Sequence, residues 1–279
     1  MDIITLQQQL ELIQQNDYTQ MYNIDLNELS IHMLQHIGTT DGYVREELIY
    51  NCFSHFILNE LLPQTQLEKL LTTCLDQNYL FCEINCPNTD GVFTRSFTTL
   101  LIALILKFDT SHSFLSVEKL KEIKEKLIDY TNRESDYRGY VKDKGWAHSI
   151  AHVSDAFNEM IHNPKIPLEW YEEIVHCILN KIFIYSTVHH TSEDERIVTP
   201  LITMLCHGLP KGRLCYIIYT KMKRLPSFKK RLPLYEYCKL CANVKTFLRT
   251  LFFRTKSDPI LSSVATQTAK MLNELPKYY

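Results

Sequence analysis

The chain has 279 residues, of which 45% are hydrophobic and 22% are charged, and its formal net charge is -2. This composition is typical of a globular protein with one large domain or two small ones, and it does not indicate general attraction to polyanions. Residues 1–7 lack a basic segment followed by an apolar run, so we expect no secretory signal peptide.

Apolar residues recur at intervals of three and four along the chain, which predicts amphipathic helices. In chain order, the clearest stripes run over residues 26–37, 67–75 and 117–127. The most apolar stretch, residues 100–106, is too short for a membrane span, which needs about 20 residues, and it predicts a buried helix. Alternation typical of strands is hard to find. We therefore expect an all-α fold of about a dozen helices with essentially no sheet.

Two segments of the chain have similar sequences, Asp41–Val44 and Arg138–Val141. Each is expected to begin a helix, and the two helices carry His55 and His152 at the same offset. A third helical hairpin lies between them, at residues 95–131. Three hairpins at this spacing predict a right-handed superhelical stack of antiparallel helical hairpins, similar to HEAT and armadillo repeats, in a single domain over residues 1–279.

The segment from Arg138 to Asp155 is the most informative part of the chain, because it holds two of the seven glycines and one of the two tryptophans. His148, His152 and Asp155 are spaced four and three residues apart. This spacing puts them on one face of a helix that we expect to begin near Trp146.

Three roles are open for the face formed by His148, His152 and Asp155. Two histidines four residues apart on a helix can bind a metal such as zinc or iron, with Asp155 as a third ligand or as the partner of an imidazole. Such a centre would make the protein a metal-dependent or hydrolytic enzyme. A contact with a partner or ligand is a second role. We favour the third, a structural cluster that forms hydrogen bonds with neighbouring helices.

The residues before this helix have a role of their own. Arg138, Tyr140, Lys142 and Trp146 form a candidate recognition loop, because arginine and aromatic side chains are favoured anchors at interfaces. Asp143 is expected to cap the following helix. The alternative is that Tyr140 and Trp146 only seal the hairpin.

The residues just described follow the pattern R-G-Y-V-x-x-K-G-W-A-H-x-x-A-H-x-x-D. This pattern resembles the signature of a bacterial domain family of unknown function from low-GC Gram-positive organisms. The resemblance implies an α-superhelix and implies no particular activity.

Residues 90–97 and 192–196 resemble the same family more weakly. Arg95 lies in an apolar helix and is expected to have an acidic partner, because an unpaired buried charge is costly. Asp194 and Glu195 suit the start of a helix. The preceding pair, His189 and His190, is expected to be an exposed loop pair.

Nine cysteines are scattered along the chain without a secretory signal. This usage predicts reduced thiols and a cytoplasmic location. Cys238 and Cys241 are the only pair with zinc-ribbon spacing, and no second pair follows them at a suitable distance. We expect both to be buried thiols in a helix over residues 234–250.

Residues 211–256 hold thirteen Lys and Arg against one acid, Glu236, so the chain has an acidic part (1–210) and a basic part (211–279). A nucleic acid, an anionic membrane surface, or acids of the same protein or of another copy would each match this charge. We favour the last account or a plain solvated face, with the bases divided among several helix faces and some of them paired with acids.

The sequence as a whole favours a cytoplasmic scaffold or adaptor that binds a protein partner or another copy of itself. The alternatives are an enzyme centred on His148, His152 and Asp155, and a nucleic-acid-binding protein that uses residues 211–256. No membrane span is expected. The sequence identifies neither a partner nor a reaction.

Overall fold

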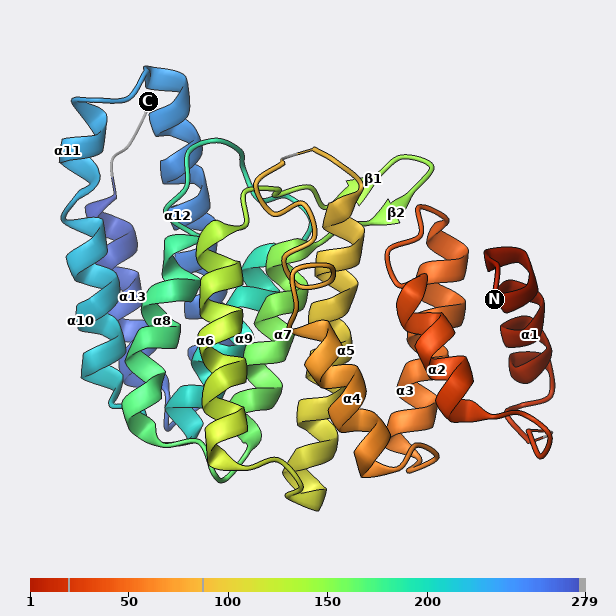
Figure 1. Ribbon diagram of the computed structural model, residues 1–279. Coiled ribbons are helices and arrows are strands. Elements are labelled where there is room, and N and C mark those ends of the chain that lie inside the picture. The colour runs from red at the N-terminus through yellow and green to blue at the C-terminus, as the bar shows by residue number, and fades with distance from the viewer. Residues whose placement is uncertain (20, 87, 276–279) are drawn as a thin grey trace. The chain divides into compact units, whose positions relative to one another are not determined.

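The structure, a computed structural model, describes residues 1–19, 21–86 and 88–275 (Figure 1). It is mostly helical, with one small two-stranded sheet among the described residues, so the expected helical class is confirmed. The chain divides into two compact units, Met1–Asn163 and Pro164–Tyr279. The single domain expected over residues 1–279 stays a prediction.

Unit 1 (Met1–Asn163) consists of helices and one short hairpin. Its elements are, in chain order, α1 (Ile3–Gln15), α2 (Leu26–Gln35), the π-helical segment η1 (Tyr43–Tyr50), α3 (Asn51–Leu58), α4 (Gln64–Cys74), α5 (Gly91–His112), α6 (Val117–Arg133), β1 (Tyr140–Val141), β2 (Gly145–Trp146) and α7 (Ser149–His162). Helices α1, α2 and α6 each begin where a side-chain oxygen of the preceding residue, Asp2, Asp25 or Ser116, accepts a backbone N–H of the first turn.

Helix α5 is the central helix of unit 1, and it packs against α3, α4 and α7 (Figure 1). Within the described part of the chain, it alone is long and apolar enough to cross a membrane by length and composition. However, 89% of its most apolar window is buried inside the protein. Helix α5 is therefore the buried helix that residues 100–106 predicted.

An ion pair inside unit 1 joins Arg95 of α5 to Glu134, just after α6. Arg95 is 1% exposed, and its Nε and Nη2 donate to the two carboxylate oxygens of Glu134 at 2.8 and 2.9 Å. Its Nη1 donates to the carbonyl of Cys82. The expected acidic partner of Arg95 is confirmed, and because each of its three guanidinium nitrogens has an acceptor, the charge is tolerated in the core.

We expect the substitution Arg95→Met to lower the free energy of unfolding by about 3–5 kcal/mol, because it leaves the Glu134 carboxylate buried without its cation. Urea denaturation of both proteins measures this difference. Arg133→Met is the matched control, because Arg133 pairs with Asp129 on the surface of α6, and such a pair contributes less than about 1 kcal/mol. Equal losses in the two variants would contradict the prediction.

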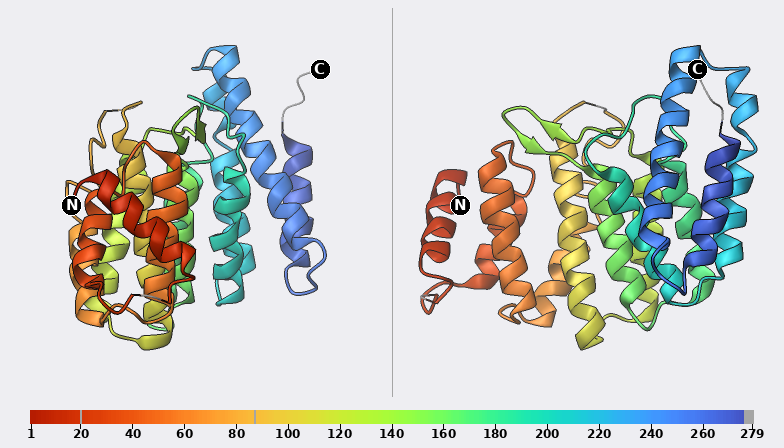
Figure 2. Two further views of the ribbon diagram at one scale, coloured as in Figure 1. Left: turned by 90° about the vertical axis from the view of Figure 1, so that its right-hand side faces the viewer. Right: turned by 180° about the vertical axis from the view of Figure 1, so that it is seen from behind.

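Unit 2 (Pro164–Tyr279) is helical throughout its described residues. Its elements are, in chain order, the short 3-10 helix η2 (Leu168–Trp170), α8 (Tyr171–Asn180), α9 (Glu193–Cys206), α10 (Lys211–Met222), α11 (Leu225–Lys229), α12 (Leu234–Thr255) and α13 (Ser262–Glu274). The long helix α12 packs against α9 and α13, and α10 packs against α8 and α13 (Figure 2). The acids Asp194 and Glu195 lie in the first turn of α9, as expected.

In the loop before α9, the expectation that His189 and His190 are both exposed is wrong for His189, which is buried, whereas His190 is exposed. The backbone N–H of His189 donates to Oδ1 of Asn243, and its Nε2 lies 2.8 Å from the carbonyl of Lys181. The amide nitrogen of Asn243 donates to two further carbonyls of this loop. The side chain of Asn243, on α12, therefore holds the loop against the core, which no local pattern in the loop indicates.

All nine cysteines are free, in agreement with the expected reduced thiols. Cys238 and Cys241 lie inside α12, as predicted. Cys52 and Cys74 are buried, whereas Cys86 and Cys206 are exposed. Burial raises the pKa of Cys52 to about 12, and it also raises the pKa of Cys74.

We expect iodoacetamide at about pH 8 to alkylate Cys86 and Cys206 of the folded protein and to leave Cys52 and Cys74 unmodified, because only the thiolate reacts and burial keeps these two thiols protonated. Tryptic digestion and mass spectrometry measure the labelling of each cysteine. The control is the same reaction in urea, where all four should react. Early labelling of Cys74 in the folded protein would refute the burial described here.

Candidate functional site

The segment that carries the signature begins with a β-hairpin. Strands β1 and β2 pair in antiparallel register, with Tyr140 opposite Trp146, and α7 begins only at Ser149. The expected helix start near Trp146 and the expected cap at Asp143 are therefore wrong. The physical reason is that Gly145 has φ +80°, outside the helical region. In addition, the backbone N–H groups of Ala147 and His148 donate to the carbonyls of Gly139 and Arg138, across the hairpin, and not to a helical turn.

This difference also affects the internal similarity of the chain. Residues 41–44 lead into the π-helical segment η1, whereas residues 138–141 lead into β1. The expected helix start is thus absent at the second position. The first segment lies close to strand β2, because a Cβ added to Gly42 would lie 3.3 Å from the Cα of Gly145.

The side chains of His148 and His152 lie close together, but only His152 lies within the helix, whereas the prediction placed both on one helix face. His148 is the residue before α7, in the left-handed conformation with φ 44°, and His152 lies in the first turn of the helix. Their ring centroids are 5.7 Å apart and the rings are perpendicular. Asp155 lies one turn further along α7. Among the residues that the structure describes, no three His, Cys, Asp or Glu side chains could hold one metal ion, so the proposed three-ligand centre is not assembled.

The buried His152 is bonded to a serine of α5. Its Nδ1 lies 2.7 Å from Oγ of Ser96, and the same hydroxyl donates to the carbonyl of Ala147. A hydroxyl has one hydrogen, so Nδ1–H of His152 is the donor to Ser96. His152 in this tautomer cannot remove a proton from Ser96, and the pair therefore does not have the arrangement of a serine nucleophile and its base. The two hydrogen bonds of the Ser96 hydroxyl join α5 to His152 of α7 and to Ala147, the residue that follows the hairpin.

A buried arginine that the sequence analysis did not single out binds the backbone of the hairpin. Arg45 of η1 is 0% exposed. Its Nη2 donates to the carbonyls of Lys144 and Trp146 at 2.6 and 3.3 Å, and its Nη1 donates to the carbonyl of Thr39 at 2.5 Å. Its Cζ lies 4.3 and 4.8 Å from two aromatic ring centroids of α5, those of Phe93 and Phe97. The guanidinium thus fixes the backbone of the hairpin to the core.

The neighbouring Glu46 completes this support. Its Oε1 accepts hydrogen bonds from Nη2 of Arg45 at 2.6 Å and from the backbone N–H of Trp146 at 2.7 Å. Burial lowers the pKa of Arg45, and the charge of Glu46 acts in the opposite direction. The carboxylate therefore compensates the buried cation and binds the hairpin at the same time.

The hairpin's own charged residues are mostly engaged inside unit 1. Arg138 binds the carboxylate of Asp136 through Nε and Nη2, and this hydrogen bonding raises the pKa of Arg138. The ammonium of Lys144 lies 2.7 Å from both oxygens of Asp90. Of the candidate recognition loop, Arg138 is thus a structural residue in this geometry, while Lys142 is exposed.

Two aromatic side chains remain on the outer face of the hairpin. Tyr140 is 58% exposed and Trp146 is 36% exposed. Their rings meet edge to face with centroids 5.1 Å apart, and Trp146 also stacks on His148 at 4.3 Å. The hairpin therefore presents a small aromatic surface, flanked by the cation of Lys142.

We expect Gly145→Ala to lower the free energy of unfolding by about 1–3 kcal/mol, because φ is positive here and the added Cβ would lie 2.8 Å from Nη2 of Arg45. The matched control is Gly212→Ala in the first turn of α10, where an added Cβ meets nothing within 4 Å. This control should be neutral or stabilise by up to about 1 kcal/mol. Urea denaturation compares the two, and equal midpoints would contradict the close packing of the hairpin.

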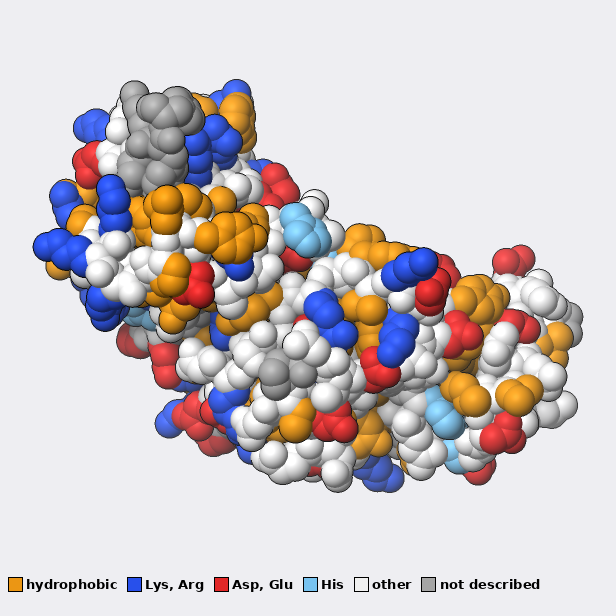
Figure 3. All heavy atoms as spheres, turned by 90° about the horizontal axis from the view of Figure 1, so that it is seen from above, with side chains coloured by type: hydrophobic (Ala, Val, Ile, Leu, Met, Phe, Trp, Pro, Cys, Tyr) orange, Lys and Arg blue, Asp and Glu red, His pale blue; other side chains and the backbone are white. Residues whose placement is uncertain are grey.

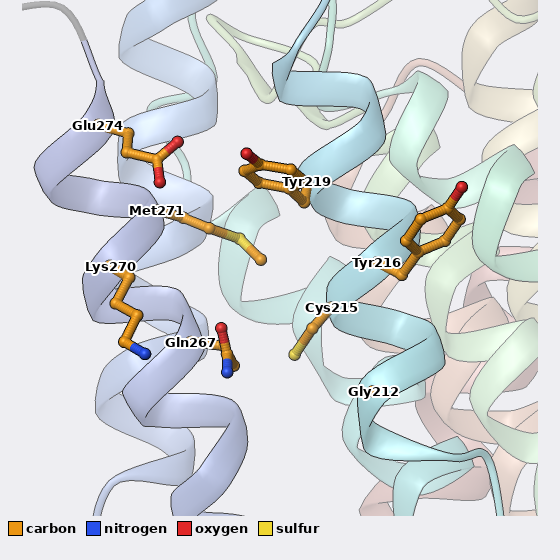
Figure 4. Close-up of a pocket in the computed structure, with 8 residues that line it drawn as sticks. All are labelled: Gly212, Cys215, Tyr216, Tyr219, Gln267, Lys270, Met271 and Glu274. Atoms are coloured by element: carbon orange, nitrogen blue, oxygen red, sulfur yellow. The ribbon is translucent and has the colours of Figure 1, made fainter.

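Unit 2 contains a groove between α10 and α13, with a volume of about 400 Å³ (Figure 4). Tyr219 of α10 and Met271 of α13 point toward one another across it. Cys215 also lines the groove, and burial raises the pKa of its thiol, which does not suit a thiolate nucleophile. The side chains that line the groove do not form a recognisable catalytic arrangement.

Some bases of residues 211–256 pair with acids of preceding helices, and others are exposed; the division of the bases among several helix faces stays a prediction. Arg213 pairs with Glu172 of α8 at 2.6 Å, and Arg254 pairs with Glu195 of α9 at 2.9 Å. Others, such as Lys229 and Lys230, are exposed, and no ion pair is found for these two within the described residues. Figure 3 shows Lys and Arg side chains on one face of the molecule. The charge of the basic part is therefore only partly compensated inside the protein.

Searches of curated proteins and of solved structures gave no match. A family model does match residues 80–253, which extend from the loop before α5 into α12 and include the hairpin. The match excludes Arg45, Glu46 and α13. Because it covers more than half of the chain, the chain belongs to the family described as protein of unknown function DUF2785.

Proposed function

We propose that this protein is a cytoplasmic scaffold or adaptor that binds a protein partner, and that the β1–β2 hairpin is its recognition element. The observation that carries the proposal is the pair of exposed aromatic side chains, Tyr140 and Trp146, on a hairpin whose backbone is held by hydrogen bonds to the side chains of Arg45 and Glu46. Tyrosine and tryptophan are enriched among the residues that dominate binding energy at interfaces.

The rigidity of the hairpin supports a binding role. Ordering a loop on association costs free energy, and a loop that is already fixed avoids most of this cost. Here Arg45 and Glu46 hold the inner edge of the hairpin, and the edge-to-face contact holds the two aromatic rings in place. We infer a partner surface with an apolar pocket beside a carboxylate, because Lys142 extends from the same hairpin.

The proposal includes a HEAT-like superhelical stack as the architecture. In unit 1, α3, α5 and α7 pack side by side (Figure 1), and in unit 2, α8 packs against α10. Packing of every second helix is the order expected of stacked helical hairpins. The cytoplasmic location is proposed from the nine free cysteines.

Site-specific crosslinking in cells tests the proposal. With p-benzoylphenylalanine in place of Lys142, irradiation should give a discrete adduct with one partner protein. The same group in place of the exposed Lys121 of α6 should not give it. An adduct with the mass of two copies would identify the partner as a second copy of this chain.

The double variant Tyr140→Ser, Trp146→Ser should reduce the adduct at least about ten-fold, because each such aromatic anchor contributes more than about 1 kcal/mol to binding. The matched control Tyr22→Ser, Phe253→Ser removes two exposed aromatic side chains elsewhere and should leave the adduct unchanged. If position 142 gives no adduct beyond that of position 121, or if both double variants behave alike, the hairpin is not the recognition element.

A further inference from the structure

The short helix α11 and the turns on either side of it carry a dense group of positive charges. Residues 221–235 contain no carboxylate, and five of their basic side chains are exposed. These are Lys223, Arg224, Lys229, Lys230 and Arg231. We call residues 223–235 the α11–α12 tip, which lies at one end of unit 2 (Figures 1 and 2).

The protein does little to neutralise these charges. Lys223 lies 3.9 Å from a carboxylate oxygen of Glu274, at the outer limit of an ion pair. Arg231 donates to Ser227 in its own turn. Arg224, Lys229 and Lys230 form no ion pair with any residue that the structure describes. The tip therefore presents a local positive potential that attracts anions.

Two apolar side chains project from the same tip. Leu234 is 70% exposed and Tyr235 is 71% exposed, in the first turn of α12 directly after the basic residues. The ammonium of Lys239 lies 4.4 Å from the ring centroid of Tyr235. A leucine and a tyrosine surrounded by cations at a projecting end are poorly accounted for by folding, because neither side chain contributes to the core.

We propose that the α11–α12 tip docks on an anionic phospholipid membrane, independently of the hairpin in unit 1. The cations lie against the acidic headgroups, and Leu234 and Tyr235 enter the interface between headgroups and acyl chains. Tyrosine is favoured at this depth because its ring is apolar and its hydroxyl is polar. An interfacial anchor of this kind combines buried apolar area with electrostatic attraction.

The apolar pair is the reason to favour a lipid surface over a nucleic acid. Binding to phosphodiesters uses the cations and gains little from an exposed leucine, because phosphate contacts are polar. A membrane uses both features. Each base near an anionic surface strengthens binding by roughly five-fold, which corresponds to about 1 kcal/mol.

Sedimentation of the full chain with lipid vesicles tests the proposal. We expect binding to phosphatidylcholine vesicles with about 30% phosphatidylserine, and none to pure phosphatidylcholine. The charge variant Lys229→Gln, Lys230→Gln, Arg231→Gln should bind roughly 100-fold more weakly. The apolar variant Leu234→Ser, Tyr235→Ser should bind at least about ten-fold more weakly.

The matched control Lys69→Gln, Lys107→Gln, Lys121→Gln has the same change in net charge on exposed side chains of unit 1 and should bind like the unchanged protein. Circular dichroism checks that each variant is folded. Absence of binding to the acidic vesicles, or an equal loss in the control, would overturn the proposal. Binding to duplex DNA that the charge variant loses and the apolar variant retains would replace the membrane with a nucleic acid.

Discussion

The geometry of the signature segment depends on the hydrogen bonds between the buried guanidinium of Arg45 and the backbone of the hairpin. A charged group without solvent contact is stable only when its donors are satisfied, because the cost of removing it from water is several kcal/mol. The two terminal nitrogens of Arg45 meet this condition through carbonyls of the hairpin and of Thr39 and through the carboxylate of Glu46, whereas its Nε has no hydrogen-bond partner in the part of the chain that the structure describes. Any movement of the hairpin away from η1 would remove two of these acceptors, the carbonyls of Lys144 and Trp146. The position of the hairpin and the stability of the surrounding core are therefore coupled.

The contacts of the signature residues indicate structural roles for several of them. Several of the polar side chains that suggested chemistry have structural partners: Arg138 binds Asp136, Lys144 binds Asp90, and His152 binds Ser96. Their hydrogen bonds hold the loop, and the hairpin side chains that remain exposed are the aromatic pair together with Lys142 and Asp143. A motif rich in polar residues thus presents two aromatic rings on its outer surface. This is why recognition is favoured over a reaction at this position.

Much of the helical structure could be predicted from the sequence. The periodic stripes indicated α4 and α6, and the cost of an unpaired charge predicted an acidic partner for Arg95. The hairpin could not be predicted, because two-residue strands are too short to show alternation. Arg45 was missed because a π-helix does not follow the 3.6-residue period on which the analysis of helix faces relied. Ser96 was missed because a serine within an apolar helix carries no signal of its long-range partner.

The close approach of η1 to the hairpin has a consequence for the limits of the matched family region. That region begins at residue 80, whereas the donors that hold the hairpin come from residue 45. A fragment cut at the start of the match would lose the cation between Phe93 and Phe97 and would leave the carbonyls of Lys144 and Trp146 without their donor. The stretch that sequence comparison defines and the compact unit that contains the hairpin therefore do not coincide, because unit 1 also includes η1, α3 and α4, which precede residue 80.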